Sequence, residues 1–232
     1  MPDFSRRDII GEVMDQPGLP VEQHRKALRA LRRINQLSCT TLQLARTIAR
    51  LVPNDPNRTL RILDIASGGG DLAIGLARYA KRRGLGWSIT GSDISPTAMD
   101  HATSAAKRAG VDVSFVQADA LAGLPGAYDM VVCTLFLHHL TDEQIVKLLS
   151  QASRAQHIVV SDLRRGRFAY AVTWLGTRLV TRSPIVHVDG PRSVRAALTP
   201  GELGALAQDA GLVGARVRRQ WPMRMMLTWT AP

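Results

Sequence analysis

The chain has 232 residues, of which 45% are hydrophobic and 21% are charged. This composition is ordinary for a folded globular protein and excludes a disordered chain, a collagen-like repeat and a disulfide scaffold. The 30 Lys and Arg outnumber the 19 Asp and Glu, and the resulting formal charge of +11 favours a partner such as nucleic acid or an anionic membrane surface.

Two helices are expected at the start of the chain. Residues 21–52 carry apolar residues at helical spacing, and the second of the two helices is expected to begin with Ser38 as its N-cap. Pro53 and the turn-rich residues after it end that helix.

Strands and helices then alternate. Strands are expected at 61–67, 87–93, 111–119, 128–136 and 157–163, with helices at 71–83, 95–110 and 141–153. An Arg-rich, aromatic segment follows at 164–198, then a helix at 199–212 and two closing strands at 213–221 and 223–229. This order predicts an α/β fold: a Rossmann-like, doubly wound, seven-stranded and mostly parallel sheet in three α/β/α layers, preceded by an N-terminal helical cap.

A glycine-rich turn follows the first strand, within ILDIASGGGD at 62–71. Gly68 and Gly70 allow the backbone to approach a ligand closely, and the helix after them offers unpaired N–H groups. The spacing from Gly68 to Ala73 also matches a dinucleotide fingerprint, so the turn alone leaves a nicotinamide-dependent dehydrogenase open.

Carboxylates at the ends of neighbouring strands favour a different ligand. Asp93 ends the second strand, where it can accept from both ribose hydroxyls, and Asp119 ends the third, where it can accept from an adenine amino group. Asp71 lies at the helix start, where it disfavours a pyrophosphate. Residues 61–150 hold eight Lys and Arg against nine Asp and Glu, a net charge of −1. A cationic ligand with an ammonium and a sulfonium group suits this surrounding.

The chain resembles the class I S-adenosylmethionine-dependent methyltransferases of the small-molecule type. Four motifs in order carry the resemblance: LDIASGGGD, GSDIS, QADA and VVCTLFLHHL, with its HHL after the fourth strand. The resemblance covers 60–163 closely and 199–229 loosely. The family's first glycine of the turn is Ala66 here, an exchange that is tolerated where the backbone φ is negative.

The resemblance implies S-adenosylmethionine as cofactor and S-adenosylhomocysteine as product. It assigns Gly68 and Gly70 to the methionine part, Asp93 to the ribose and Asp119 to the adenine. The expected cofactor-binding residues are Asp64, Ala66, Ser67, Gly68, Gly70, Asp93, Ile94, Asp119, Ala120 and Cys133. Asp64 also fits a buried strand acid bonded by backbone N–H groups, and Asp71 also fits a helix-start acid that interacts with the dipole.

The resemblance also divides the chain. Residues 1–57 would form the helical cap and 58–232 the methyltransferase domain, with an acceptor-side insertion at about 164–198. Within this insertion, residues 168–180 are amphipathic. They would either pack into the core or form a lid over an aromatic or lipid-like acceptor.

Two adjacent histidines, His138 and His139, follow the fourth strand, where this fold exposes residues to the transferred methyl group. A histidine there can serve as a general base near neutral pH. Adjacent side chains diverge, so at most one is expected to face the acceptor, and the family's HL dipeptide favours His139. The alternative is that both pack or cap the next helix. The scattered histidines and separated cysteines predict no metal site.

Four further residues are candidates for acceptor contacts: Asp162, Arg165, Trp174 and His187. Asp162 ends the fifth strand at the ligand-bearing edge, and its alternative is a pairing with Arg164 or Arg165. His187 is expected in a loop, where solvation is the alternative to a role as base. Trp174 alternatively packs in the core.

We predict a methyltransferase that acts on oxygen, or carbon, of a small hydrophobic acceptor, phenolic or polyketide-like and of the kind met in secondary metabolism. Nearby arginines would complement a carboxylate or phenolate. Two alternatives stay open: the same transfer to RNA or another polyanion, and a non-catalytic scaffold with a vestigial cofactor pocket. The absence of an appended RNA-binding module or basic tail in the sequence argues against nucleic acid as the acceptor.

No apolar run approaches the ~18 residues of a spanning helix, and the N-terminus lacks an apolar signal core. We therefore expect a cytoplasmic protein without a transmembrane segment. Cys39 and Cys133 are expected as reduced thiols. A homodimer is compatible with the sequence.

Overall fold

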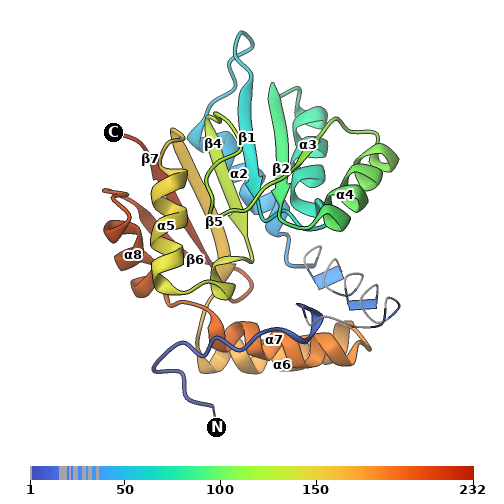
Figure 1. Ribbon diagram of the computed structural model, residues 1–232, viewed down its shortest axis with the longest axis vertical. Helices are drawn as coiled ribbons and strands as arrows, with labels where there is room; N and C mark the ends of the chain where they lie inside the picture. The colour runs from blue at the N-terminus through green and yellow to red at the C-terminus, as the bar shows by residue number, and fades with distance from the viewer. Residues whose placement is uncertain are drawn as a thin grey trace.

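The architecture is a seven-stranded sheet between layers of helices (Figure 1). The computed structural model describes residues 2–15, 20, 22, 26–27, 30, 33–34 and 37–232. The strands are β1 (Leu60–Ile65), β2 (Trp87–Asp93), β3 (Ser114–Gln117), β4 (Met130–Thr134), β5 (His157–Leu163), β6 (Arg216–Gln220) and β7 (Arg224–Thr230). They lie in the order β3-β2-β1-β4-β5-β7-β6, and only β7 runs antiparallel to its neighbours. The predicted doubly wound, mostly parallel sheet is confirmed.

The sheet is buried on both faces, which explains the apolar character of its central strands. The helices are α2 (Thr40–Leu51), α3 (Asp71–Arg83), α4 (Pro96–Ala109), α5 (Asp142–Ala152) and α8 (Pro200–Asp209). Ile62 packs with residues of α2 and α3, whereas the next residue, Leu63, packs with α5 and α8 on the opposite face. Successive side chains of the strand thus belong to two separate hydrophobic clusters, one on each face of the sheet.

Helix starts follow the capping rules where the sequence shows them. Ser95 accepts a hydrogen bond from the Ala98 N–H, and Thr141 forms a capping box with Gln144. The prediction of Ser38 as an N-cap is wrong. The helix begins at Thr40 after Cys39, whose φ is 51°.

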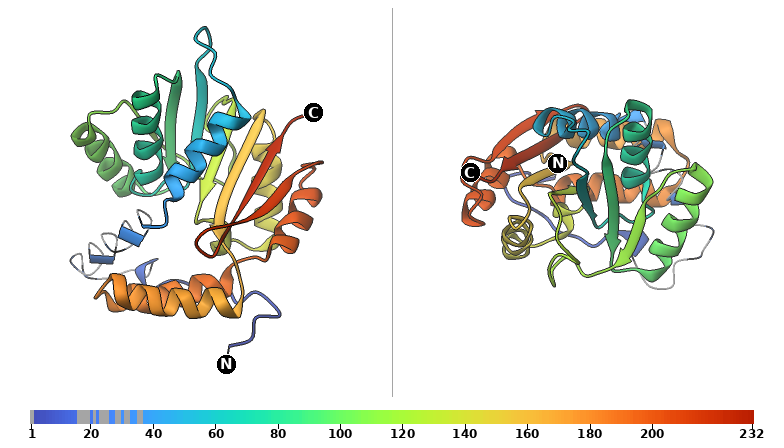
Figure 2. Two further views of the ribbon diagram at one scale, coloured as in Figure 1. Left: turned by 180° about the vertical axis from the view of Figure 1, so that it is seen from behind. Right: turned by 90° about the horizontal axis from the view of Figure 1, so that it is seen from above.

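The segment between β5 and α8 is helical rather than loop-like. It forms α6 (Arg167–Val180) and α7 (Pro184–Ala196). The loop expected around His187 is wrong, because Ser183 and Pro184 start α7 with proline in the first helical turn. Figures 1 and 2 show α6 and α7 lying across the carboxyl ends of the parallel strands, with the N-terminal segment running beside α7.

The first predicted cap helix falls mostly on residues outside those described. Ala27 and Ala30 are described and buried, and they pack with Ile185 and Val186 of α7. Over the described residues, none of the helices combines the length and apolar character that crossing a bilayer requires.

Gly91 in the middle of β2 offers a test of the packing between β2 and β3. A Cβ there would lie 2.7 Å from two ring carbons of Phe115 and 2.8 Å from Ser67 Oγ. We expect Gly91→Ala to lower the free energy of unfolding by about 1–3 kcal/mol in denaturant titrations.

Gly204→Ala is the matched control. Gly204 lies inside α8, and a Cβ there meets no atom within 4 Å. We expect this variant to be about 0.5–1 kcal/mol more stable, because alanine loses less backbone entropy in a helix. Equal effects of the two substitutions would contradict the packing argument.

Candidate active site

A cavity of about 590 Å³ opens between the carboxyl end of the sheet and the α6–α7 layer. This is where open α/β sheets bind ligands, and the size suits a small molecule. Eight of the predicted site residues line the cavity: Ala66, Gly68, Asp93, Ile94, Asp119, Ala120, His138 and His139.

The glycine-rich turn after β1 is wound through left-handed backbone conformations. The φ angles are +53° at Ala66, +51° at Gly68 and +76° at Gly70. The expectation of a negative φ at Ala66 is therefore wrong, and an alanine there carries a conformational cost of about 1 kcal/mol. A Cβ at Gly68 would meet no protein atom within 4 Å, so its backbone is open to a ligand.

Gly70 has a packing role instead. A Cβ there would lie 2.7 Å from Phe115 Cζ and 2.9 Å from Ala102 Cβ. Gly70 is also outside the cavity lining, as are Ser67 and the buried Cys133. The third glycine of the turn thus lets α3 and β3 approach, rather than exposing backbone to the cavity.

Asp93 joins the glycine-rich turn to the start of α4. Its Oδ2 accepts a hydrogen bond from the Gly68 N–H at 2.9 Å, and its Oδ1 accepts from the Ser95 N–H at 3.0 Å. Both bonds hold the carboxylate in one orientation on the cavity wall. Asp119 is held similarly, with its Oδ1 accepting from the Leu121 N–H at 2.8 Å.

Asp64 lies beneath the turn and is buried, with 1% of its surface exposed. Burial, helped by the neighbouring charge of Asp93, raises the pKa of Asp64 to about 8, although a hydrogen bond from the Ala73 backbone opposes the shift. Its Oδ2 has no hydrogen-bond partner among the described residues. Asp64 thus supports the turn from behind and does not line the cavity.

His138 forms a buried pair with Asp162. The short 3₁₀ turn η2 (Leu137–His139) after β4 places His138 Nδ1 2.7 Å from Asp162 Oδ1. Burial alone would lower the pKa of His138, but the charges of Asp162 and Glu12 outweigh it and raise the pKa to about 9. Asp162 responds in the opposite sense: burial would raise its pKa, and His138 lowers it. The pair is therefore an imidazolium and a carboxylate at neutral pH.

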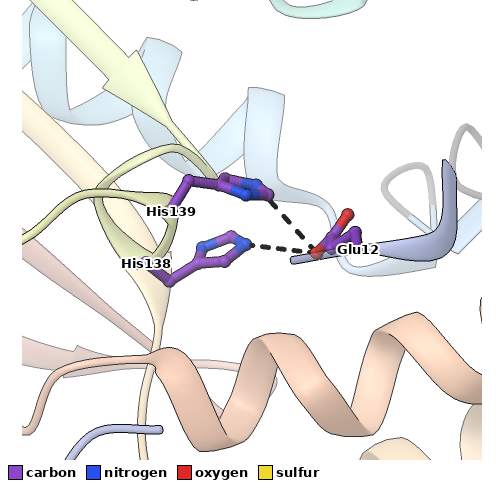
Figure 3. A group of neighbouring side chains, drawn as sticks. All are labelled: Glu12, His138 and His139. Carbon is purple, nitrogen blue, oxygen red and sulfur yellow. Dashed lines mark ion pairs between the residues drawn. The ribbon is translucent and has the colours of Figure 1, made fainter. Parts of the chain in front are cut away.

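Glu12 comes from the N-terminal segment and faces both histidines (Figure 3). Its Oε1 lies 3.7 Å from His138 Nε2 and 4.0 Å from His139 Nε2, and it also accepts a hydrogen bond from Ser193 Oγ. Burial would raise the pKa of Glu12, but the two histidines and Ser193 lower it. The more exposed of the two rings is His139, whose side chain is 31% exposed.

Glu12, His138 and His139 are also the described residues whose ligand atoms could gather around a metal ion, within 4.8 Å of one another. Two ligands on one tetrahedral zinc ion lie about 3.4 Å apart, given bonds of about 2.1 Å. The separations of 3.7 and 4.0 Å are longer. The charged state of His138 also favours an ion-pair network over a metal centre.

The four candidates for acceptor contacts all lie outside the cavity lining. Asp162 is buried behind His138, and Arg165 donates to Glu202 Oε2 and to the Ala197 carbonyl, each at 2.8 Å. Trp174 points outward from α6, and His187 Nε2 lies 2.8 Å from the Thr181 carbonyl. The structure thus gives Arg165 and His187 structural partners.

Sequence reasoning missed the cavity residues that come from distant segments. They include Glu12, Met14, Thr173, Thr177, Asp189, Ser193 and Arg224. Asp189 accepts from the Val13 and Met14 N–H groups, so it fastens the N-terminal segment to α7. Of these residues, only Arg224 could have been singled out from the sequence, because a charged arginine is unusual beside the methionines of an apolar strand.

The comparisons with known proteins agree with this geometry. Residues 62–157 match a family described as a methyltransferase domain. The chain is 31% identical over 157 residues to a ubiquinone biosynthesis O-methyltransferase of Cupriavidus pinatubonensis, covering 66% of this chain and 59% of the relative. A relative of the same name from Ralstonia nicotianae is 29% identical, over 68% of this chain and 65% of that one. The chain thus spans about three fifths of their length.

Two solved structures share the fold over nearly the whole of both chains. The plantazolicin methyltransferase BpumL, in complex with SAH, is superimposed with a TM-score of 0.65 at 17% identity, over 94% of this chain and 92% of that one. Magnesium protoporphyrin IX methyltransferase from Synechocystis PCC 6803, with bound SAH, gives 0.59 at 18% identity, over 94% and 91%. At these identities the likeness establishes the fold.

The raised pKa of His138 predicts a pH dependence of stability. The folded state binds the proton with a pKa of about 9, against about 6.5 for a free imidazole. The stabilisation is therefore complete below about pH 6.5 and is lost as the pH rises through 9. We expect a loss on the order of 2–3 kcal/mol in the free energy of unfolding across this range.

The reference is the double variant His138→Gln/Asp162→Asn, which keeps a neutral hydrogen-bonding pair in place of the charged one. Denaturant titrations across the same pH range should show a shallower dependence for this variant, since other titrating groups contribute equally to both proteins. Parallel curves would contradict the assignment of the proton to His138.

Proposed function

We propose that the chain is a class I S-adenosylmethionine-dependent methyltransferase that transfers a methyl group to oxygen (or carbon) of a small hydrophobic acceptor, phenolic or polyketide-like. The observation that carries this proposal is Asp93, whose carboxylate two backbone N–H groups fix on the cavity wall.

The residues present fit S-adenosylmethionine. Asp93 and Asp119 offer carboxylate oxygens suited to ribose hydroxyls and an adenine amino group, and Gly68 leaves open space beside the turn. These carboxylates favour a cationic ligand over a pyrophosphate. When bound, the cofactor supplies an electrophilic methyl group on a positively charged sulfur.

The rest of the cavity fits an apolar acceptor with a hydroxyl group. Leu135, Phe136, Leu163 and Val186 give it apolar walls. His139 supplies a polar group among them, as expected for a site that must orient a largely hydrophobic molecule. The name of the curated relatives, ubiquinone biosynthesis O-methyltransferase, supports oxygen as the acceptor atom.

We assign the proton transfer to His139. A phenol must lose its proton to become a good nucleophile, and imidazole is the side chain suited to accept it near neutral pH. His138 is already protonated at that pH, so its role is to place a positive charge beside the cavity, where it stabilises an anionic oxygen. Glu12, 4.0 Å from His139 Nε2, stabilises the proton once it resides there.

Asp93→Asn tests the cofactor site. It keeps the size of the side chain but removes the charge, and we expect S-adenosylmethionine affinity, measured by calorimetry, to fall roughly tenfold or more. Asp100→Asn, on the exposed face of α4, is the control and should leave affinity unchanged. Equal affinities of the wild type and Asp93→Asn would remove Asp93 from the cofactor site.

His139→Gln tests the base. In a labelled-methyl screen of phenolic, polyketide, lipid and RNA pools, we expect the wild type to label phenolic or polyketide acceptors. With such an acceptor the variant should lose about 10²–10⁴-fold in kcat while cofactor affinity stays the same. His187→Gln, outside the cavity lining, is the control. Labelling of RNA alone would replace the proposed acceptor, and an unchanged kcat would refute the assignment of His139.

A further inference from the structure

One face of α6 exposes a stripe of large apolar side chains. Phe168, Val172, Leu175 and Leu179 are 68%, 36%, 53% and 76% exposed, and Ala171 lies exposed among them. Their spacing places them on a single side of the helix. We call these five residues the α6 stripe. Figure 1 and the left view of Figure 2 place α6 at the lower edge of the molecule, with the sheet above it.

The inner face of the same helix has the opposite character. Thr173 and Thr177 line the cavity, and Thr177 is buried. Gly190 of α7 allows the close contact, since a Cβ there would lie 2.9 Å from Thr177 Cγ2. A surface helix ordinarily buries its large apolar residues and exposes the small and polar ones. The reversed arrangement in α6 leaves an apolar surface that packing among the described residues does not explain.

Cationic side chains run beside the α6 stripe. Arg167, Arg178 and Arg182 are exposed, and the Arg178 guanidinium lies 3.9 Å above the ring of Trp174, itself 45% exposed. Residues 163–188 contain five arginines and neither Asp nor Glu. An apolar face bordered by tryptophan and arginine is the pattern of a helix that lies in the interface of a membrane.

We propose that the α6 stripe docks on a lipid bilayer whose surface is anionic. The arginines beside the stripe complement phosphate headgroups, while the apolar side chains enter the boundary with the acyl chains. The helix has 14 residues, fewer than the ~20 that span a bilayer, so it lies parallel to the membrane plane.

Charge also decides against a second copy of the chain as the occupant. Two α6 stripes packed together would bring the arginine rows of two copies close to each other. Residues 163–188 contain no Asp or Glu, and like charges held together oppose association. An anionic lipid surface attracts the same arginines.

Vesicle flotation tests the proposal with the full chain and no acceptor present, so the result is independent of methyl transfer. The two probes are vesicles of phosphatidylcholine alone and of phosphatidylcholine mixed with phosphatidylglycerol. We expect binding to the mixed vesicles to be roughly tenfold stronger and to weaken as salt is raised.

The double variant Leu175→Glu/Leu179→Glu places two charges in the α6 stripe and should lower binding to the mixed vesicles roughly tenfold or more. Val213→Glu is the matched control, because Val213 is 81% exposed and lies outside α6. It makes the same kind of change and should bind like the wild type. Since all three replaced side chains are exposed, thermal unfolding should show that every variant folds.

Three results would overturn the proposal. The first is failure of the folded wild type to float with the mixed vesicles. The second is equal binding of the stripe variant and Val213→Glu. The third is a wild-type dimer, measured by light scattering, that becomes monomeric in Leu175→Glu/Leu179→Glu, because that would assign the α6 stripe to a second copy.

Discussion

The buried pair of His138 and Asp162 holds together the parts of the chain that make the cavity. Asp162 is the second-last residue of β5, and His138 follows β4 in the turn η2. Glu12, from the N-terminal segment, lies against the other side of the His138 ring. Glu12 is in turn bonded by Ser193 of α7. Because an unpaired charge at this depth would be strongly unfavourable, each of these segments constrains the position of the next.

The cavity therefore has two electrostatic ends. Asp93 and Asp119 make the end beside β2 and β3 negative, which suits a cationic cofactor. At the other end the His138 imidazolium lies between the carboxylates of Asp162 and Glu12, beside the place proposed for the acceptor oxygen. The neutral-to-acidic middle of the sequence supplies the first end, whereas much of the positive excess lies outside the cavity, as in the arginines beside the α6 stripe. The net charge of the chain is thus the sum of an acidic cavity end and an arginine-rich outer surface, which have different roles.

The fold and the cofactor end could be predicted because their signals are local. Strand periodicity, caps such as Ser95, and a carboxylate at a strand end are all readable within a few residues. Glu12 could not be predicted, since only the tertiary arrangement brings it to the histidines. The place of Arg165 outside the cavity lining could not be predicted for the same reason: its partner Glu202 is remote in sequence. The positive φ of Ala66 could not be predicted either, because the geometry of the turn imposes it although alanine prefers a negative φ.

The α6 helix shows a more general limit of periodicity. The pattern of residues 168–180 identifies two faces, but the same pattern results whether the apolar face is turned inward or outward. In this protein the neighbouring helix α7 determines which face of α6 turns inward. Gly190 leaves room for the threonine face to pack closely, which commits that face to the cavity and turns Leu175 and Leu179 outward. A glycine on α7 thereby determines which surface α6 presents to its surroundings.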